Sequence, residues 1–167
     1  DVEAFLGKQV GLFKNFGANP LKQLVNGSRV RSFEAKEAIL HRGDEATHLG
    51  VVLSGEVSAD TGNGQHLGEL KAGDTFGELS LMSGQPEFAT FAAKSPCQVL
   101  LIPVSLFQSI IVAEPGAVQT ISRTIAERMK MILSDPAKAA SAFQEGDDPY
   151  GLKLKGERPE KILVINC

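Results

Sequence analysis

The 167-residue chain contains few of the features that mark secreted or membrane-spanning proteins. Its two cysteines, Cys97 and Cys167, provide no disulfide framework, and we expect Cys97 to be a small residue of the core. No apolar run is long enough to cross a bilayer, and no basic and apolar leader begins the chain. The net charge of -3 argues against a dominant nucleic-acid-binding surface. We therefore expect a cytoplasmic protein that has neither a membrane nor a nucleic acid as partner.

Sequence patterns of metal binding and of catalysis are also lacking. The three histidines, His41, His48 and His66, have no cysteine or carboxylate at metal-ligand spacing, so we assign no metal. The Ser-Gly pairs at 54–55 and 83–84 lack the nucleophile-elbow pattern and a suitable base. The chain itself is therefore predicted not to be an enzyme.

Strand patterns dominate the middle of the chain. The segment 51–57 is rich in valine and leucine and contains a Ser-Gly turn, and 99–102 repeats this composition. With 43% apolar residues, the chain can bury one sizeable core. Short strands separated by glycine turns favour an all-β roll or barrel-like sandwich. The fold class is therefore predicted to be mainly β with flanking helices.

Helical periodicity brackets this β region. Before it, apolar residues with helical spacing are broken by Gly17 and Asn19-Pro20, which predicts two short amphipathic helices. After it, an apolar stripe at three- and four-residue steps predicts one long amphipathic helix. Ser134-Asp135-Pro136 ends that helix and begins another over 137–144. The first set is Phe5, Leu12, Phe13, Phe16, Leu21, Leu24 and Val25, and the stripe is Val118, Ile121, Ile125, Met129 and Ile132.

The segment 76–90, FGELSLMSGQPEFAT, carries the clearest functional signal. Gly73 and Gly77 permit tight turns, and residues 78–82 are compatible with a single helical turn. The free backbone N–H groups at the start of such a turn form an anion site of the kind that holds phosphates. Glu78 beside this site would repel a phosphate, so we expect it to accept a hydrogen bond from a sugar hydroxyl.

The end of the same segment is suited to close approach by a ligand. Pro86 fixes φ and removes a donor, while Ala89 and Thr90 are small enough for backbone and hydroxyl donors to come near. A plain strand connection with a helix-capping glutamate is the alternative for an isolated Gly-Glu-Leu. The whole spaced string favours a binding site instead.

This string resembles the phosphate-binding cassette of the cyclic nucleotide-binding domain family, found in catabolite activator protein and in regulatory subunits of cAMP-dependent kinase. The family pattern is Phe-Gly-Glu-Leu-(Ala/Ser)-Leu, a short spacer, and then Pro-Arg-x-Ala-Thr. The resemblance implies a double-stranded β-helix, a jelly-roll-like β-roll, with cAMP or cGMP as its ligand. The matching residues are Phe76, Gly77, Glu78, Leu79, Ser80, Leu81, Pro86, Ala89 and Thr90.

Glu87 departs from the family pattern. The arginine that the family carries there pairs with the exocyclic oxygens of the phosphate, and the family residue matching Glu78 holds the ribose 2′-hydroxyl. Loss of a buried arginine partner should weaken binding by about 3 to 5 kcal/mol, roughly two to three and a half decades of affinity. The bulk of Phe88 also fills part of the pocket, so we predict that cAMP and cGMP bind weakly or not at all. The cations that could swing in, besides a bridging metal ion, are Arg42, Lys71 and Lys94.

The resemblance covers roughly residues 12–132. The segment from Val30 to Asp60 is similar to the first strands of the family, with an Arg-Gly-Asp turn at 42–44 and a turn glycine at Gly55. Lys36 stands where members usually carry glycine. Because a positive φ strains lysine, we expect a local change of the turn there.

The end of the chain suggests a following domain. Residues 146–161 are rich in glycine, proline and charge, which predicts a linker. Residues 162–166, ILVIN, are typical of a short buried strand, which needs ladder partners, and KILVINC resembles the opening strand of acetate kinases. Because the chain also begins at Asp1 rather than at a methionine, we expect an excised regulatory domain that precedes an acetate kinase-like effector.

We therefore expect four segments: helices in 1–27, the β-roll in 28–113, C-terminal helices in 114–145, and a linker with the start of a following domain in 146–167. The leading function is a cyclic nucleotide-type sensor whose long helix controls an effector in cis. The alternative is a ligand-free docking module or a homodimer formed through helix 118–132. A fragment of a catabolite activator-type transcription regulator comes third, because the tail is too irregular for a DNA-binding helix pair. The predicted ligand-binding residues are Phe76, Gly77, Glu78, Leu79, Ser80, Pro86, Glu87, Phe88, Ala89 and Thr90.

Overall fold

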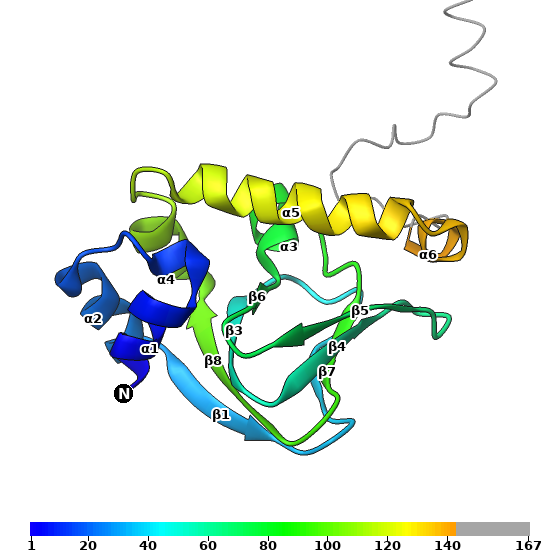
Figure 1. Cartoon of the computed structure of the whole chain (residues 1–167), viewed down its shortest axis with the longest axis horizontal. Helices are drawn as coiled ribbons and strands as arrows, with labels where there is room; N and C mark the ends of the chain where they lie inside the picture. Colours follow the sequence, from blue (N-terminus) through cyan, green and yellow to red (C-terminus); the bar gives the residue numbers. More distant parts are fainter. Residues whose placement is uncertain (143–167) are drawn as a thin grey trace, which may run out of the picture.

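The computed structural model describes residues 1–142, which form a β-roll with a helical layer at one end (Figure 1). The strands are β1 Arg29–Phe33, β2 Ala38–Leu40, β3 His48–Ser54, β4 Glu56–Asp60, β5 His66–Lys71, β6 Thr75–Phe76, β7 Thr90–Ala93 and β8 Cys97–Pro103. The helices are α1 Val2–Gln9, η1 Gly11–Phe13, α2 Ala18–Asn26, α3 Glu78–Ser83, α4 Val104–Leu106, the π-helix η2 Phe107–Ile111, α5 Ala117–Leu133 and α6 Pro136–Ala142. The predicted mainly-β class with flanking helices is confirmed.

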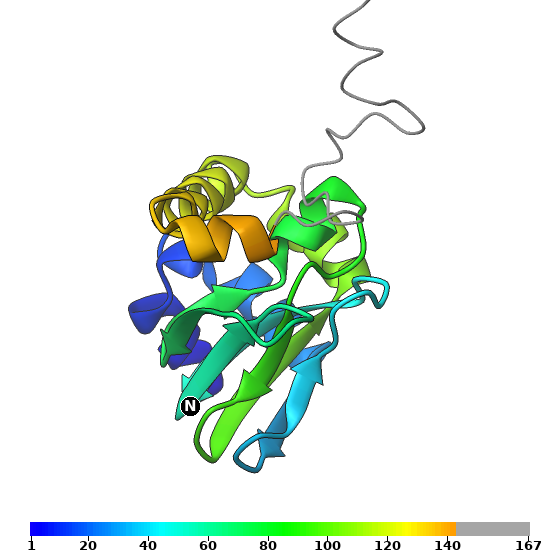
Figure 2. The same cartoon turned by 90° about the vertical axis from the view of Figure 1, so that its right-hand side faces the viewer.

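Two four-stranded antiparallel sheets make up the roll. Their strand orders are β1-β8-β3-β6 and β2-β7-β4-β5. In the first sheet β8 lies between β1 and β3, and Val51 stands opposite Leu100 in this ladder. Figure 1 shows α5 crossing one end of the roll, with α1 and α2 beside the roll, and Figure 2 shows both sheets below the C-terminal helices. This arrangement is the jelly-roll-like β-roll that the sequence predicts.

The core between the sheets depends on a close approach at Gly50. Gly50 pairs with Phe76 across β3 and β6, and a Cβ atom at Gly50 would lie 2.3 Å from Cζ of the Phe76 ring. The ring is fully buried and its centroid lies 5.0 Å from that of Phe91. Phe76 therefore holds the start of the predicted cassette against the second sheet. Cys97 is also buried, as expected for a residue of the core.

The helices pack mostly as the sequence predicts. The two N-terminal helices are present as α1 and α2, with the turn η1 between them. The predicted break at Asn19-Pro20 is wrong, because both residues lie in the first turn of α2, after Gly17 at its N-cap. On α5 the stripe residues Ile121, Met129 and Ile132 are buried, but Val118 is 38% exposed and its neighbour Ala117 is buried instead. The predicted stripe is therefore wrong at its first residue. The other stripe residues pack against this domain's own core.

The turn at Lys36 differs from the prediction. Lys36 keeps a φ of 76° and is the one non-glycine residue with positive φ in the described part of the chain. Its backbone N–H donates to the Ala93 carbonyl at 2.6 Å, and the Ala93 N–H donates to the Glu37 carbonyl at 2.8 Å. These bonds hold the left-handed turn in place. The expected change of turn is therefore wrong, and the lysine adopts the strained geometry.

Helix α6 begins where the sequence places a cap. The Asp135 side chain accepts from the backbone N–H of Ala137 at 3.0 Å. The helix starts at Pro136, one residue before the predicted start, and is described to Ala142. The predicted linker and the predicted strand at 162–166 lie outside the described residues. Within residues 1–142, no helix is long and apolar enough to cross a membrane.

Candidate functional site

The predicted cassette forms a short helix between β6 and β7. Gly77 has a φ of 91°, which lets the chain turn out of β6 directly into α3. Helix α3 ends at Gly84, whose φ is 75°, and the chain then returns to β7. The predicted helical turn is therefore confirmed. A Cβ atom at Gly77 would lie 3.1 Å from the His48 carbonyl, so the glycine also allows close packing against β3.

A cavity of about 170 Å³ lies between the cassette, the β4–β5 sheet edge and helix α5. Half of the ten predicted ligand-binding residues line it: Gly77, Glu78, Leu79, Ser80 and Phe88. Helix α5 contributes Ile125, Arg128, Met129, Met131 and Ile132, and the sheet contributes Ala59, Leu67, Gly68, Glu69, Leu70 and Phe91. Most of these side chains are apolar, which suits a flat organic ligand better than an ion.

The other predicted site residues lie behind or beside the cavity. Phe76 and Ala89 belong to the core, and Pro86 is exposed at the end of the cassette. The Thr90 hydroxyl accepts from the Arg42 backbone N–H at 3.1 Å. This bond holds the turn at 42–44, and the hydroxyl keeps its own proton to donate, so the expected contact of Thr90 with a ligand stays a prediction.

Glu78 is buried, and both of its carboxylate oxygens have partners. It is 3% exposed. Its Oε1 accepts from Nη1 of Arg128 at 3.1 Å, and its Oε2 accepts from the Thr75 hydroxyl. Nη2 of Arg128 also donates to the Thr75 carbonyl at 2.5 Å. The carboxylate expected to hold a sugar hydroxyl is thus already bound to helix α5.

Sequence reasoning missed Arg128 and Thr75 as residues of this site. Arg128 lies beside the apolar stripe of α5, next to Met129, where a polar side chain suggests only a solvent-facing position. The one available signal was its position three residues after Ile125, on the edge of the face that packs against the cassette. Its role depends on how α5 crosses α3, which the sequence of α5 alone does not specify.

Glu87 is as buried as Glu78 but has no partner for its side chain. It is 3% exposed, and neither carboxylate oxygen has a hydrogen-bond partner. The Ser80 hydroxyl close by donates instead to the Pro86 carbonyl at 3.3 Å. Glu87 does not line the cavity, and its Oε2 lies 4.0 Å from the place of a Cβ atom at Gly77. Its side chain thus occupies the space behind the α3 turn.

The backbone holds Glu87 in this unfavourable place. Its carbonyl accepts from the Gly43 N–H at 2.7 Å, and its N–H donates to the Asp44 carbonyl at 2.9 Å. Together with the bond between Arg42 and Thr90, these contacts join the 42–44 turn to the end of the cassette. The Arg-Gly-Asp turn therefore positions residue 87 by main-chain bonds, whatever side chain stands there.

The environment favours the neutral form of Glu87. Burial raises its pKa to about 7, and repulsion by Glu78 and Asp44 acts in the same direction, while the nearby Ser80 hydroxyl opposes it. The charged groups that shift this pKa, Glu78 and Asp44, are both acidic.

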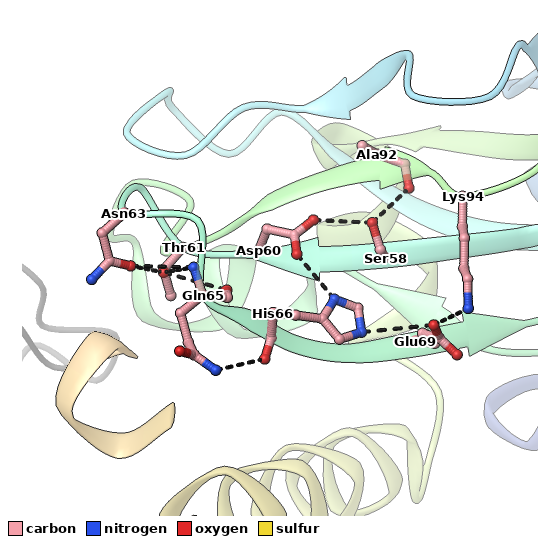
Figure 3. Close-up of polar contacts among 9 residues, drawn as sticks. All are labelled: Ser58, Asp60, Thr61, Asn63, Gln65, His66, Glu69, Ala92 and Lys94. Atoms are coloured by element: carbon pink, nitrogen blue, oxygen red, sulfur yellow. Dashed lines mark hydrogen bonds and ion pairs between the residues drawn. The ribbon is translucent and has the colours of Figure 1, made fainter. Parts of the chain in front are cut away.

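The sheet wall beside the cavity carries a row of polar contacts (Figure 3). His66 lies between two carboxylates, with its Nδ1 3.0 Å from Asp60 and its Nε2 3.7 Å from Glu69. Glu69 also pairs with Lys94, and the Lys94 hydrogen bond lowers the pKa of that carboxyl group. Lys94, one of the cations considered as a replacement for arginine, is thus bound at the edge of the sheet. Within residues 1–142, no group of three or more histidine, cysteine or carboxylate side chains is placed to hold a metal ion.

Comparison with known proteins identifies the family. The family model described as the cyclic nucleotide-binding domain matches residues 30–114, half of the chain. The chain belongs to the cyclic nucleotide-binding domain family. The recognition made from the cassette is therefore confirmed.

Curated relatives place this domain in several kinds of protein. A cyclic nucleotide-gated potassium channel of Rhizobium etli is 32% identical over 71% of this chain and 33% of the channel. The cAMP-activated global transcriptional regulator CRP of Pasteurella multocida is 28% identical over 88% of this chain and 80% of the regulator. The chain spans a third or less of the length of the first curated relatives it matches.

Solved structures share the fold at low sequence identity. The structure of cAMP-bound PfPKA-R has a TM-score of 0.72 and 20% identity over 86% of this chain and 49% of its own. A mutant regulatory subunit of a cAMP-independent protein kinase A from Trypanosoma brucei, bound to cAMP, has a TM-score of 0.65 and 22% identity over 72% and 44%. The corresponding subunit from Trypanosoma cruzi, bound to guanosine, has a TM-score of 0.61 and 20% identity over 74% and 48%.

Proposed function

We propose that this chain is a regulatory sensor domain in which helix α5 reports whether the cavity is occupied. The ion pair between Glu78 of α3 and Arg128 of α5 supports this most directly. A ligand hydroxyl that binds Glu78 has to displace or share Arg128, so binding changes how α5 is held. A ligand shifts an equilibrium only through such a difference in contacts between two states.

The size of the cavity supports a closed state. About 170 Å³ is below the roughly 300 to 1,000 Å³ of typical small-molecule pockets. Met129 and Ile132 of α5, both buried, and the partly buried Phe88 reduce the space. A nucleotide-sized ligand therefore needs α5 to move outward, and that movement is the signal that an attached effector would receive.

The ligand that we propose has no phosphate. Glu87 offers a buried carboxyl group where a phosphate would need a cation, so cAMP and cGMP bind weakly. A nucleoside keeps the apolar base and the sugar hydroxyls that the cavity and Glu78 suit. The guanosine bound by the Trypanosoma cruzi subunit is a precedent for such a ligand in this fold.

A ligand-free docking or dimerisation module is the second candidate. The small cavity, narrowed by Phe88, Met129 and Ile132, favours it, because the pocket is closed by its own side chains. Glu78 is also already satisfied by Arg128. In that case α5 would bind a partner protein or a second copy of the chain directly, through its exposed Met131 and Leu133.

Several expectations about the whole protein stay predictions. They are the four-segment division, the effector in cis, its likeness to acetate kinases, the homodimer, the cytoplasmic location and the absence of nucleic-acid and membrane partners. Because a transcriptional regulator is among the relatives, the third hypothesis, a fragment of a catabolite activator-type transcription regulator, stays open. The residues on which the effector hypothesis depends, 162–167, lie outside the described part.

Guanosine and cGMP form a matched pair for the test, because they differ in the cyclic phosphate alone. We expect calorimetry to show guanosine binding at least about tenfold more tightly than cGMP, a difference of about 1.4 kcal/mol. Amide NMR shifts of α5 should change on binding. Tighter binding of cGMP would overturn the phosphate-free ligand, and no binding of guanosine, adenosine, cAMP or cGMP would favour the docking module.

A further inference from the structure

The Glu87 side chain is a buried ionisable group that the proposed sensor does not use. Both of its oxygens are fully enclosed and lack hydrogen-bond partners. A charged carboxylate in such a place is strongly disfavoured, because nothing replaces the water that it loses. The protonated form avoids most of this penalty. The side chain therefore has a stable neutral form and an unstable ionised form in the same position.

The charged groups around Glu87 do not provide a ready counter-ion. Glu78 on α3 and Asp44 on the 42–44 turn are both acidic. Arg128 on α5 is engaged by Glu78 and the Thr75 carbonyl. From the 42–44 turn, Arg42 extends its guanidinium to the β4–β5 turn, where its Nη1 would lie 2.6 Å from a Cβ atom at Gly62.

Strands β2 and β3 also face the cassette at Gly77, through the Leu40 side chain and the His48 carbonyl. The His48 ring lies near the Thr47 hydroxyl, with its Nδ1 at 2.9 Å. Burial and the charge of Arg29 lower the pKa of His48, which favours the neutral imidazole.

We propose that Glu87 makes the cassette a proton-responsive switch: the protonated side chain keeps the cassette closed against α5, and loss of its proton loosens both. The inference rests on the proposed function, since α5 is the element that reports the state of the cassette. The proton is then a second signal, besides the ligand, that changes how α5 is held.

The coupling follows from the contacts of the cassette. Main-chain bonds to Gly43 and Asp44 hold residue 87 while its side chain is neutral. An ionised side chain gains solvation if the 84–89 segment moves outward, or a counter-ion if Arg128 leaves Glu78. Both movements disturb the pair that joins α3 to α5. Burial of Glu87 raises its pKa to about 7, which places the change near neutral pH.

The test is an NMR titration of the ligand-free chain, with ¹³C-labelled glutamate side chains, from pH 5 to 9. We expect one carboxyl resonance, absent from Glu87→Gln, to titrate with a midpoint near 7. The amide shifts of α5 residues 125–132 should follow the same midpoint. Glu87→Gln should keep α5 in its low-pH state at every pH. Glu127→Gln, which removes an exposed carboxylate one residue from Arg128, should leave both titrations unchanged.

Two results would overturn the switch. One is a Glu87 resonance that titrates in the range of exposed glutamates. The other is a Glu87 midpoint near 7 without any accompanying change in α5. Guanosine binding to Glu87→Gln at pH 6 and pH 8 separates the two proposals, because it tests the ligand site in a chain without the titrating group. If guanosine binds to Glu87→Gln while the wild-type chain is insensitive to pH, the switch proposal is wrong and the sensor proposal stands.

Discussion

Glu78 and Glu87 are equally buried in one cassette, yet their carboxyl groups have opposite surroundings. Glu78 has a guanidinium and a hydroxyl as partners, whereas neither oxygen of Glu87 has any. A buried carboxylate with donors is a stable structural element, and one without donors is disfavoured in its charged form. By the family resemblance, the first stands on the ribose side of the pocket and the second on the phosphate side. Under the proposed function, the sugar half of the site is therefore kept and the phosphate half is lost.

Reversing the charge at residue 87 gives the largest expected effect. Glu87→Arg removes the buried carboxyl group and places a cation where the family carries one. We expect the affinity for cAMP to rise by roughly two to three decades, measured by calorimetry at pH 7.5. Glu127→Arg adds an equal charge change on the exposed face of α5 and should leave the affinity unchanged. A Glu87→Arg chain that binds no better than wild type would mean that Arg128 or Phe88 is the main obstacle.

The pH dependence of stability should distinguish the two glutamates next. Because the pKa of Glu87 is raised from 4.5 to about 7, the unfolded chain releases this proton at lower pH than the folded chain. The stability that protonated Glu87 contributes is therefore complete below about pH 4.5 and decreases as the pH rises towards 7. Above pH 7 it does not change further. The decline amounts to at most about 3 kcal/mol. Urea unfolding at several pH values should show the decline in wild type and a flatter profile in Glu87→Gln.

A third prediction concerns the satisfied member of the pair. Glu78→Ala leaves the Arg128 guanidinium and the Thr75 hydroxyl without their carboxylate. Because Arg128 is 33% exposed and regains some water, we expect a loss of about 2 kcal/mol rather than the larger value of a fully buried pair. Urea unfolding measures it. As a control, Glu127→Ala on α5 should change the free energy of unfolding by less than about 0.5 kcal/mol. An equally small loss in Glu78→Ala would show that the pair of Glu78 and Arg128 does not stabilise the fold.

The comparison also separates what the sequence could predict from what it could not. The short helix of the cassette depends on residues close in the chain, so local spacing was enough to find it. The anomaly at Glu87 became visible through the resemblance to the family pattern. The β-roll followed in the same way from repeated strands and glycine turns.

Contacts between distant elements escaped prediction. Arg128 meets Glu78 across 50 positions of the sequence, and its role depends on the angle at which α5 crosses α3. Likewise, Ala117 is buried in place of Val118, in the core cluster that the N-terminal helices share with β3 and β8. The helical period predicts a buried face, but the neighbouring element decides where that face begins.

Lys36 gives the smallest effect and tests backbone strain away from the pocket. Its positive φ is held by the bonds to Ala93 and Glu37 rather than relieved by a different turn. Lys36→Gly should remove this strain and stabilise the chain by about 1 kcal/mol in urea unfolding. Gly64→Ala is the matched reverse change, since Gly64 has a φ of 84° and an added Cβ would meet no atom within 4 Å. It should destabilise the chain by about 1 kcal/mol. If Lys36→Gly lowers stability instead, the lysine side chain contributes more than the strain it imposes, and the turn is better adapted to lysine than its φ implies.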